Sequence, residues 1–438
     1  MKNNLKSVPI LNKKMIIPFI LVCTIFGLWG LASAVTDPMV QAFKKVLELS
    51  NGQAAWVQMA FYGGYFCMAL PAAVFVNKFN YKVGIIVGLA LYGIGALLFY
   101  PAAMTEQFWF FCLSLYVLTF GLAFLETTAH PYIITMGNPL SGTRRLNFAQ
   151  SFNSVGMIVG LLIAQKFILK KLQSDDIKSF ESLDDIHKIT IRTLDLLVIR
   201  DPYVVLGIVV LVYLLIIGIL KMPMNKNLKA TPPLGKTLAR LSRNKIYRIG
   251  FIAQVFYVGV QIMCWTYIYQ YAEAKGIGSN KAANYQFVAF ILFLGGRVVG
   301  TYLLKYYKAS LLLKVFAIFG IISCFGTIFF TNLIGLYMLV ITSFFMSIMW
   351  PTIYGETLRD LKSKDIMIGA AGLVMAIGGG ALMPKLQGDF IDIGGNGVSD
   401  VYWLGIPEVN WSFILPLFCF VYIVYYSHQI MINEKIEF

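Results

Sequence analysis

The stretch of sequence that decides the fold is Gln107-FWFFCLSLYVLTFGLAFLETTAHPYIIT-Met136. It is long enough to cross a bilayer as a helix, which takes about 20 apolar residues. Its one acidic side chain, Glu126, lies near the middle of the apolar part. A carboxylate at membrane depth is costly unless it is paired, protonated or hydrated. We therefore expect a membrane-spanning helix that carries a functional carboxyl group.

The composition of the whole chain agrees with this interpretation. Of 438 residues, 58% are hydrophobic and 13% are charged, and the mean hydropathy is +0.72. Soluble domains carry about 25% charged residues, so most of the surface must lie in lipid. The net charge of +15 does not indicate a nucleic-acid partner, because the basic residues sit in short loops between apolar runs rather than along one groove.

About twelve apolar runs of membrane-spanning length follow one another. We expect an all-α membrane protein with twelve transmembrane helices in two six-helix halves, 1–221 and 249–438, joined by the polar and basic linker 222–248. Two such halves around a central site form a known transporter architecture. The runs lie near 15–43, 54–76, 83–103, 107–136, 148–168, 203–221, 249–271, 284–304, 310–330, 333–354, 366–384 and 411–428.

The distribution of Lys and Arg predicts the orientation. With a cytoplasmic amino terminus, the inner loops and termini hold 23 of these residues and the outer side holds 12, of which 7 lie at or in the long segment 166–200. Long loops have little weight in this rule. We therefore expect both termini to be cytoplasmic.

Two carboxyl groups and a histidine are candidates for proton handling. Glu126 has no Lys or Arg within helical reach, and burial without a cation favours the neutral form, so we expect it to bind and release a proton near neutral pH. Asp37 ends the first apolar run before Pro38; it is either a cavity-facing group or a helix-end residue at the interface. His130 shares a helical face with Glu126. It either tunes Glu126, bonds a ligand, or is an interhelical histidine with satisfied hydrogen bonds.

Two helices carry polar stripes on otherwise apolar surfaces. Amides also serve as hydrogen-bonding groups between helices, but two stripes together with two carboxyl groups favour a binding site. Amides with aromatic rings suit a sugar, because amides bond hydroxyl groups and rings stack on the apolar sugar face. The stripes are Gln150 and Asn153 in the fifth run, and Gln254, Tyr257, Gln261 and Trp265 in the seventh.

Arg297 lies among glycines in Gly295-Gly296-Arg297-Val298-Val299-Gly300, where we expect a structural or gating role.

The lack of catalytic motifs argues against an enzyme. The chain has no nucleotide-binding loop, no HExxH motif and no Cys/His metal spacing. We expect no enzyme activity, no cofactor and no metal.

Several segments resemble the fucose permeases of the major facilitator superfamily, in order along nearly the whole chain. They are Leu28-Trp29-Gly30 with Asp37, Gln58-x-x-Phe61-Tyr62-Gly63-Gly64-Tyr65-Phe66, Leu125-Glu126-Thr127-Thr128-Ala129-His130-Pro131, Asn147-Phe148-Ala149-Gln150-Ser151-Phe152-Asn153, and Tyr257-Val258-Gly259-x-Gln261-x-x-Cys264-Trp265.

The resemblance implies a role for each matching residue. The Glu of the fourth helix, here Glu126, is the proton-coupling group, and the Asp of the first, here Asp37, is also needed for transport. Gln150 and Asn153 match residues that line the sugar cavity.

Three positions depart from the fucose permease pattern. Ala34 and His130 each replace an Asn, and Met349-Trp350 replaces a Gln-Tyr pair before Pro351. All three would fall on cavity-lining helices, so they leave the coupling intact and put the identity of the sugar in doubt.

We predict a monomeric bacterial inner-membrane transporter that takes up a monosaccharide with a proton by alternating access. L-fucose or a close relative is the first expectation, with His130, Gln261, Trp265 and Trp350 also contacting the substrate. The alternatives are a same-fold transporter of glucose, galactose or an amino sugar, and an exporter of small metabolites. A membrane enzyme or a receptor is disfavoured, because no catalytic motif or signalling domain is present.

Overall fold

The computed structural model describes residues 11, 15–47, 56–138, 141–173, 183–220, 234–362, 365–395 and 397–436, except the side chains of residues 37, 40, 41, 44, 45, 279, 280, 394, 435 and 436. Within this part, 12 helical segments are long and apolar enough to cross a membrane. The predicted all-α fold with twelve spans is confirmed, and the chain is an integral membrane protein.

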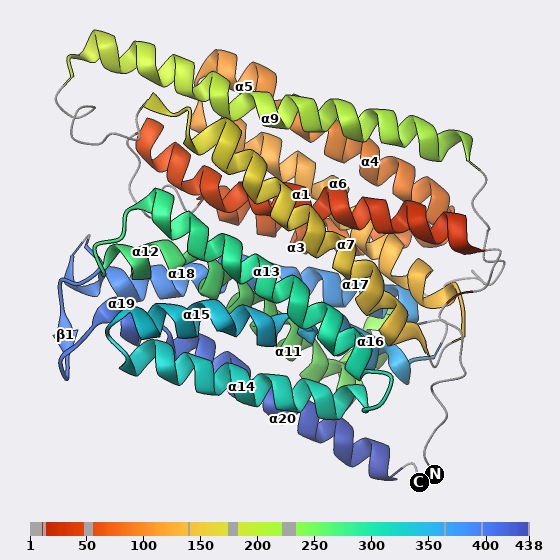
Figure 1. Ribbon diagram of the computed structural model, residues 1–438. Helices are drawn as coiled ribbons and strands as arrows, with labels where there is room; N and C mark the ends of the chain where they lie inside the picture. Colours follow the sequence, from red (N-terminus) through yellow and green to blue (C-terminus); the bar gives the residue numbers. More distant parts are fainter. Residues whose placement is uncertain are drawn as a thin grey trace.

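The first six spans pack together, coloured red to lime in Figure 1. In this group α6 contacts α3, α4 and α7, while α1 lies along α7 and α9 covers α4 and α5. The elements are α1 (Ile16–Val46), α3 (Trp56–Lys78), α4 (Tyr81–Leu97), α5 (Phe99–Thr105), α6 (Phe108–Thr135), α7 (Gly142–Ile163) with its π-helical continuation η4 (Ala164–Leu169), and α9 (Asp185–Ile219).

The last six spans form a second group, coloured green to blue. Here α11 packs on α18 and α20, and α14 on α15 and α20. The elements are α10 (Leu234–Arg243), α11 (Lys245–Thr266), α12 (Ile268–Glu273), α13 (Ser279–Leu303), α14 (Ala309–Phe329), α15 (Leu333–Met346), α16 (Met349–Arg359), α17 (Ile366–Met375), η6 (Ala376–Gly378), α18 (Gly379–Ile391), η7 (Asp392–Gly394), β1 (Tyr402–Trp403), β2 (Ile406–Pro407), α19 (Glu408–Trp411) and α20 (Ile414–Ile436).

The two ends of the bundle are distinct. At the end that we call the linker end, α1 begins, α20 ends, and α10 lies against α11 and α17. At the other end, the hairpin end, β1 pairs antiparallel with β2, with Tyr402 opposite Pro407. The two groups meet through α3 with α17 and α18, and through α7 with α13 and α16. A central site between them is therefore bounded by helices of both groups.

The basic segment between the groups includes a docked helix. Residues 222–233 of the expected linker lie outside the described part, and α10 follows them. Thr237 and Leu241 of α10 are buried, and the Arg240 guanidinium donates to both carboxylate oxygens of Asp365. This ion pair raises the pKa of Arg240 above its usual value.

Helix boundaries differ from the expected ones at several places, of which the sixth and eleventh spans are examples. The sixth span was expected from 203, but α9 begins at Asp185. Its charged first turns continue the helix beyond the apolar run, and hydropathy alone does not detect such an extension. The eleventh span was expected to end at Pro384, but α18 continues through it to Ile391.

Close helix packing depends on glycine, as is usual where lipid provides no hydrophobic driving force between helices. The crossing of α1 and α7 is the tightest example. A Cβ atom placed on Gly156 would lie 1.9 Å from the Gly27 carbonyl oxygen, and one placed on Gly30 would lie 2.1 Å from the Asn153 carbonyl oxygen. This crossing also carries the residues of the central site, so its geometry determines where they lie.

Replacing Gly156 with Ala should destabilise the protein, because the added methyl group meets backbone atoms that cannot rotate away. We expect a loss of about 1–3 kcal/mol, as is typical of overpacking, measured as a lower melting temperature in detergent. The matched control is Gly218→Ala, where no atom lies within 4 Å of the added carbon. Equal melting temperatures for the two variants would contradict the packing argument.

Candidate functional site

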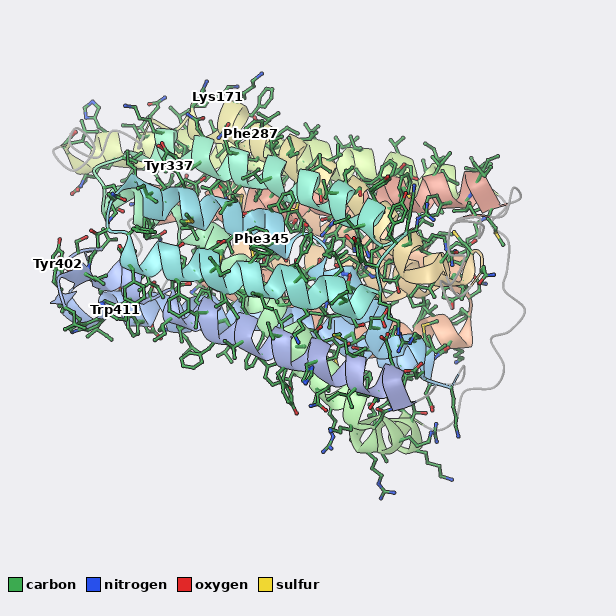
Figure 2. All side chains as sticks on the ribbon, turned by 60° about the horizontal axis from the view of Figure 1, so that its bottom comes forward. Lys171, Phe287, Tyr337, Phe345, Tyr402 and Trp411 are labelled. Atoms are coloured by element: carbon green, nitrogen blue, oxygen red, sulfur yellow. The ribbon has the colours of Figure 1, made fainter. Side chains whose placement is uncertain are left out.

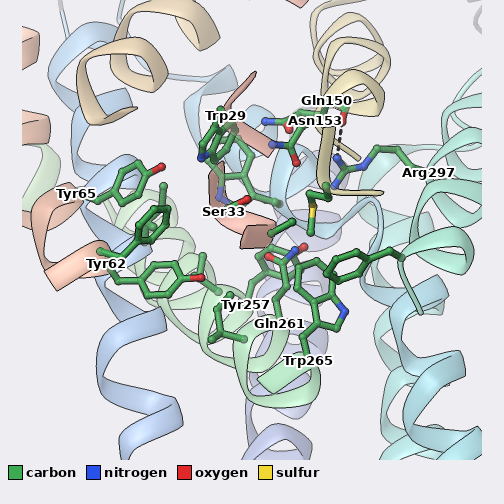
Figure 3. Close-up of a pocket in the computed structure, with 18 residues that line it drawn as sticks. Trp29, Ser33, Tyr62, Tyr65, Gln150, Asn153, Tyr257, Gln261, Trp265 and Arg297 are labelled. Carbon is green, nitrogen blue, oxygen red and sulfur yellow. Dashed lines mark hydrogen bonds between the residues drawn. The ribbon is translucent and has the colours of Figure 1, made fainter. Parts of the chain in front are cut away.

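A cavity of about 70 Å³ lies between the two groups of helices. It is lined from α1, α3 and α7 on one side, and from α11, α13, α16 and η6 on the other. Amides and aromatic rings predominate among its polar and large side chains. The labelled residues in Figure 3 are Trp29, Ser33, Tyr62, Tyr65, Gln150, Asn153, Tyr257, Gln261, Trp265 and Arg297.

The structure brings five of the six predicted substrate residues to this cavity. Gln150 and Asn153 line it from α7, Gln261 and Trp265 from α11, and Trp350 from α16. Two of them are held by further bonds: Asn153 Nδ2 donates to the Phe26 carbonyl at 3.3 Å, and Trp265 Nε1 donates to Ser343 Oγ at 3.1 Å. Fixed amide and indole groups therefore face each other across the boundary between the groups.

The sixth predicted residue, His130, lies behind the cavity. Its Nδ1 atom is 2.9 Å from the Glu126 carbonyl oxygen and therefore donates to it, while its Nε2 atom is 2.8 Å from the Gln150 amide nitrogen and accepts from it. Only a neutral ring makes both bonds. The ring also packs against Trp350, with centroids 4.5 Å apart. His130 is thus an interhelical histidine that orients Gln150.

Glu126 is buried without a hydrogen-bond partner. Its side chain is 2% exposed, and neither carboxylate oxygen has a partner among the described residues. The Tyr65 and Tyr354 hydroxyls lie within electrostatic range of it, on α3 and α16. Because an isolated buried carboxylate is strongly disfavoured, this arrangement holds the carboxyl in its neutral form.

Arg297 crosses from one group of helices to the other. Its guanidinium donates to the Ser347 carbonyl at 2.7 Å and to the Gln150 carbonyl at 2.8 Å, and it lies over the Phe293 ring at 4.5 Å. No ion pair involves it in the part of the chain that the structure describes. The side chain is a buried cation at the cavity wall, joined to α7 by one hydrogen bond (Figure 3).

Asp37 is placed only by its backbone. It lies in α1, one helical turn beyond the cavity-lining Ser33, and its side chain is outside the described part. Among the described residues, no three His, Cys, Asp or Glu side chains come together to hold a metal ion.

Several lining residues were not identified as site residues from the sequence. Trp29 and the pair Tyr62 and Tyr65 belong to motifs that were used only to identify the family. A signal was present, because Tyr62 and Tyr65 are three residues apart and therefore share a face of α3. Apolar helices commonly carry such aromatic pairs, so the spacing alone did not separate lining from packing.

Contacts between the groups close the cavity towards both ends. On the hairpin side, Gln58 Nε2 donates to Thr266 Oγ1 at 3.2 Å, and a Cβ atom on Gly380 would lie 3.0 Å from the Tyr62 ring. On the linker side, a Cβ atom on Gly355 would lie 2.7 Å from Thr143 Oγ1. The lining of the cavity suits a molecule that offers both hydroxyl groups and an apolar face.

Comparisons with known proteins place these features in a family. The model of the Major Facilitator Superfamily matches residues 19–383. An L-fucose-proton symporter of Haemophilus influenzae is 52% identical over 426 residues, which is 96% of this chain and 98% of that protein. A glucose/galactose transporter of Brucella abortus is 28% identical over 92% of this chain and 91% of its own length.

A solved structure shows the same arrangement of helices. The crystal structure of the Escherichia coli fucose:proton symporter superposes with a TM-score of 0.79 at 31% sequence identity, covering 95% of this chain and 98% of that one.

Substitutions of Gly380 and Gly355 test separately from which side of the membrane the cavity can be reached. Gly380→Val should hold the hairpin end open, and Gly355→Val the linker end, because each added side chain overlaps the facing group of helices. An overpacking penalty of about 1–3 kcal/mol shifts such an equilibrium roughly 5- to 150-fold. The measurement is labelling of Ser33→Cys by a membrane-impermeant thiol reagent applied to each side of sealed vesicles.

The background for this labelling carries Cys67→Ser, because Cys67 is the exposed cysteine among the six. The control variant is Gly378→Ala, whose added carbon meets Phe66 at an ordinary 3.4 Å. Labelling that rises equally from both sides, or in the control as well, would contradict the assignment of the two closed ends.

Proposed function

The chain belongs to the major facilitator superfamily, and on that premise we propose that it is a proton-coupled symporter for L-fucose or a closely related monosaccharide. The observation that carries the proposal is the buried, unpartnered carboxyl of Glu126, one helix away from a cavity lined with amides and aromatic rings. The L-fucose-proton symporter that is 52% identical to this chain supports the same activity.

The sugar would bind between the groups of helices. The Gln150 and Asn153 amides supply hydrogen bonds from one group, and Gln261 supplies them from the other. Trp265 and Trp350 offer ring faces for the apolar side of the sugar. Because the contacts come from both groups, the bound sugar favours the state in which both groups surround it.

Sugar binding and proton binding would be linked through His130. A sugar hydroxyl that bonds to Gln150 would contact the amide whose nitrogen donates to His130 Nε2. The other ring nitrogen of His130, Nδ1, donates to the Glu126 backbone carbonyl. The carboxyl is within electrostatic range of Tyr65, which lines the cavity, and of Tyr354 on α16. We infer that the proton reaches Glu126 from the cavity past Tyr65 and leaves towards the linker end past Tyr354.

The transition between states would break contacts that join the groups. The Arg297 bond to the Gln150 carbonyl is one of these, because α13 and α7 must separate when the groups rock about the central site. This is the gating role expected for Arg297. Asp37, one helical turn beyond Ser33 in α1 towards the hairpin end, would act as a second proton or sugar group.

The expected placement in the cell completes the proposal. We propose a monomer in the bacterial inner membrane with the linker end cytoplasmic, so that uptake runs from the hairpin end to the linker end. The two six-helix halves would be the moving bodies. Nothing in the activity requires a cofactor.

A hexose such as glucose or galactose is the second candidate substrate. Two positions that depart from the fucose permease pattern, Ala34 and Trp350, line the cavity, and the third, His130, bonds to Gln150. The glucose/galactose transporter at 28% identity is consistent with this alternative. Uptake of radiolabelled L-fucose, D-glucose and D-galactose into energised cells decides between them, and failure of all three would contradict both candidate substrates.

Glu126→Gln should abolish accumulation of sugar against a gradient while exchange of sugar between the two sides continues. The substitution keeps the shape of the side chain and fixes its neutral state, so the loaded transporter still changes conformation but releases no proton. The measurement compares net uptake with counterflow in proteoliposomes. Glu273→Gln, at an exposed position, is the control, and concentrative uptake by the Glu126 variant would refute the coupling role.

His130→Asn should weaken sugar binding without changing the pH dependence of uptake. The neutral ring adds no charge near Glu126, but its loss frees the Gln150 amide, at about 0.5–1.5 kcal/mol for one hydrogen bond. Calorimetry should show a rise in Kd of roughly 2- to 13-fold from this loss. In a Gln150→Ala background the same change should have little further effect; additive losses would show that His130 acts elsewhere.

A further inference from the structure

A second and larger cavity lies outside the central site, on the surface of the first group of helices. This groove of about 370 Å³ runs between α1, the junction of α7 with η4, and α9. Its walls are apolar, and Leu31, Ile163, Phe167 and Val205 are among them. Phe167 and Val205 are 52% and 60% exposed. Because all three helices belong to membrane spans, the groove opens to the hydrocarbon of the bilayer.

The groove has a basic mouth at the hairpin end. Lys171 lines it, two residues after the last residue of η4, and Figure 2 shows Lys171 at the periphery of the bundle. Lys166 and Lys170 lie on the same short segment, and none of the three lysines takes part in an ion pair among the described residues. Two carboxylates described near the mouth already have partners: Asp201 pairs with Arg200 at 2.7 Å, and Asp195 Oδ1 accepts from the Gln173 backbone N–H at 2.9 Å.

The local helix geometry is unusual at this point. Residues Ala164–Leu169 form a π-helix, a rare form that appears frequently at functional sites. Its wider turn follows the last regular turn of α7, where Ile163 lines the groove, and brings Phe167 and Lys171 to the same cavity. Lys171 Nζ lies 5.5 Å from the Phe167 ring centroid, so the basic mouth and the apolar wall are in contact.

We propose that this groove binds one phospholipid with an anionic headgroup, whose acyl chain lies along α1 and α9 and whose phosphate is held by Lys171 and Lys170. The position of the groove across the membrane suits a phospholipid. Its apolar walls lie within the spans, at the level of acyl chains, and the lysines lie where α7 and η4 leave the membrane, at the level of headgroups. The positive mouth is complementary to a negative headgroup, which adds attraction for each lysine near the surface.

The position of α1 gives this lipid an influence on the central site. One face of α1 presents Leu28 and Leu31 to the groove, and the neighbouring face presents Trp29 and Ser33 to the central cavity. A lipid wedged between α1 and α9 therefore restrains the helix that carries part of the central cavity wall. The proposal rests on the groove and its lysines, and holds whichever substrate the protein carries.

The test is native mass spectrometry of the full chain in detergent, titrated with dioleoylphosphatidylglycerol or dioleoylphosphatidylcholine. We expect one phosphatidylglycerol to bind at lower concentration than phosphatidylcholine. Lys170→Gln and Lys171→Gln should each weaken binding about fivefold, the effect of one basic residue at a membrane surface. Val205→Trp, which fills the groove, should abolish tight binding of the first lipid.

Two control variants separate the site from general surface effects. Val212→Trp places the same side chain on an exposed part of α9 outside the groove, and Lys281→Gln removes one exposed lysine from the second group. Both should bind phosphatidylglycerol like the unmodified protein. Equal affinity for the two lipids, equal losses in the controls, or dimerisation that Val205→Trp abolishes would each overturn the proposal.

Discussion

The structure depends on one electrostatic constraint, the burial of the Glu126 carboxyl in a low-dielectric interior without a partner. An ionised carboxylate in such a place is strongly disfavoured, whereas a neutral one is tolerated. The two protonation states of this group therefore have very different energies in the closed arrangement observed here. Any conformation that gives the carboxyl access to water or to a cation reverses the preference, which ties protonation to the packing of the two groups.

The surroundings of Glu126 are built to keep that preference. His130 uses its two ring nitrogens for a backbone bond and for Gln150, so it remains neutral and offers no counter-charge. The buried cation at the wall of the central cavity, Arg297, is held by the Ser347 and Gln150 carbonyls. On the proposed roles of Glu126 and Gln150, a proton, a bound sugar and the interface between the groups would be linked through a few short contacts rather than through a long pathway.

Glycine has a complementary part, because it determines how closely the two groups and their helices approach. Within the first group, Gly27 and Gly156 bring α1 against α7, and this crossing positions the amide stripe. Between the groups, Gly355 and Gly380 lie on opposite sides of the cavity and each faces a side chain of the other group. The same residue type therefore serves close contacts inside a group and close contacts between the groups.

The sequence by itself determined the class of fold and most of the chemistry of this protein. Hydropathy determines which segments enter lipid, and so twelve spans could be predicted, although the polar start of α9 at Asp185 could not, because helix formation there does not depend on apolar residues. Helical spacing placed Gln150 with Asn153 and Gln261 with Trp265 on common faces. Only the tertiary structure decided that these faces meet in one cavity, that His130 lies behind this cavity, and that Tyr65 lines it. Such relations depend on contacts between helices that are far apart in the chain, and spacing along one helix does not encode them.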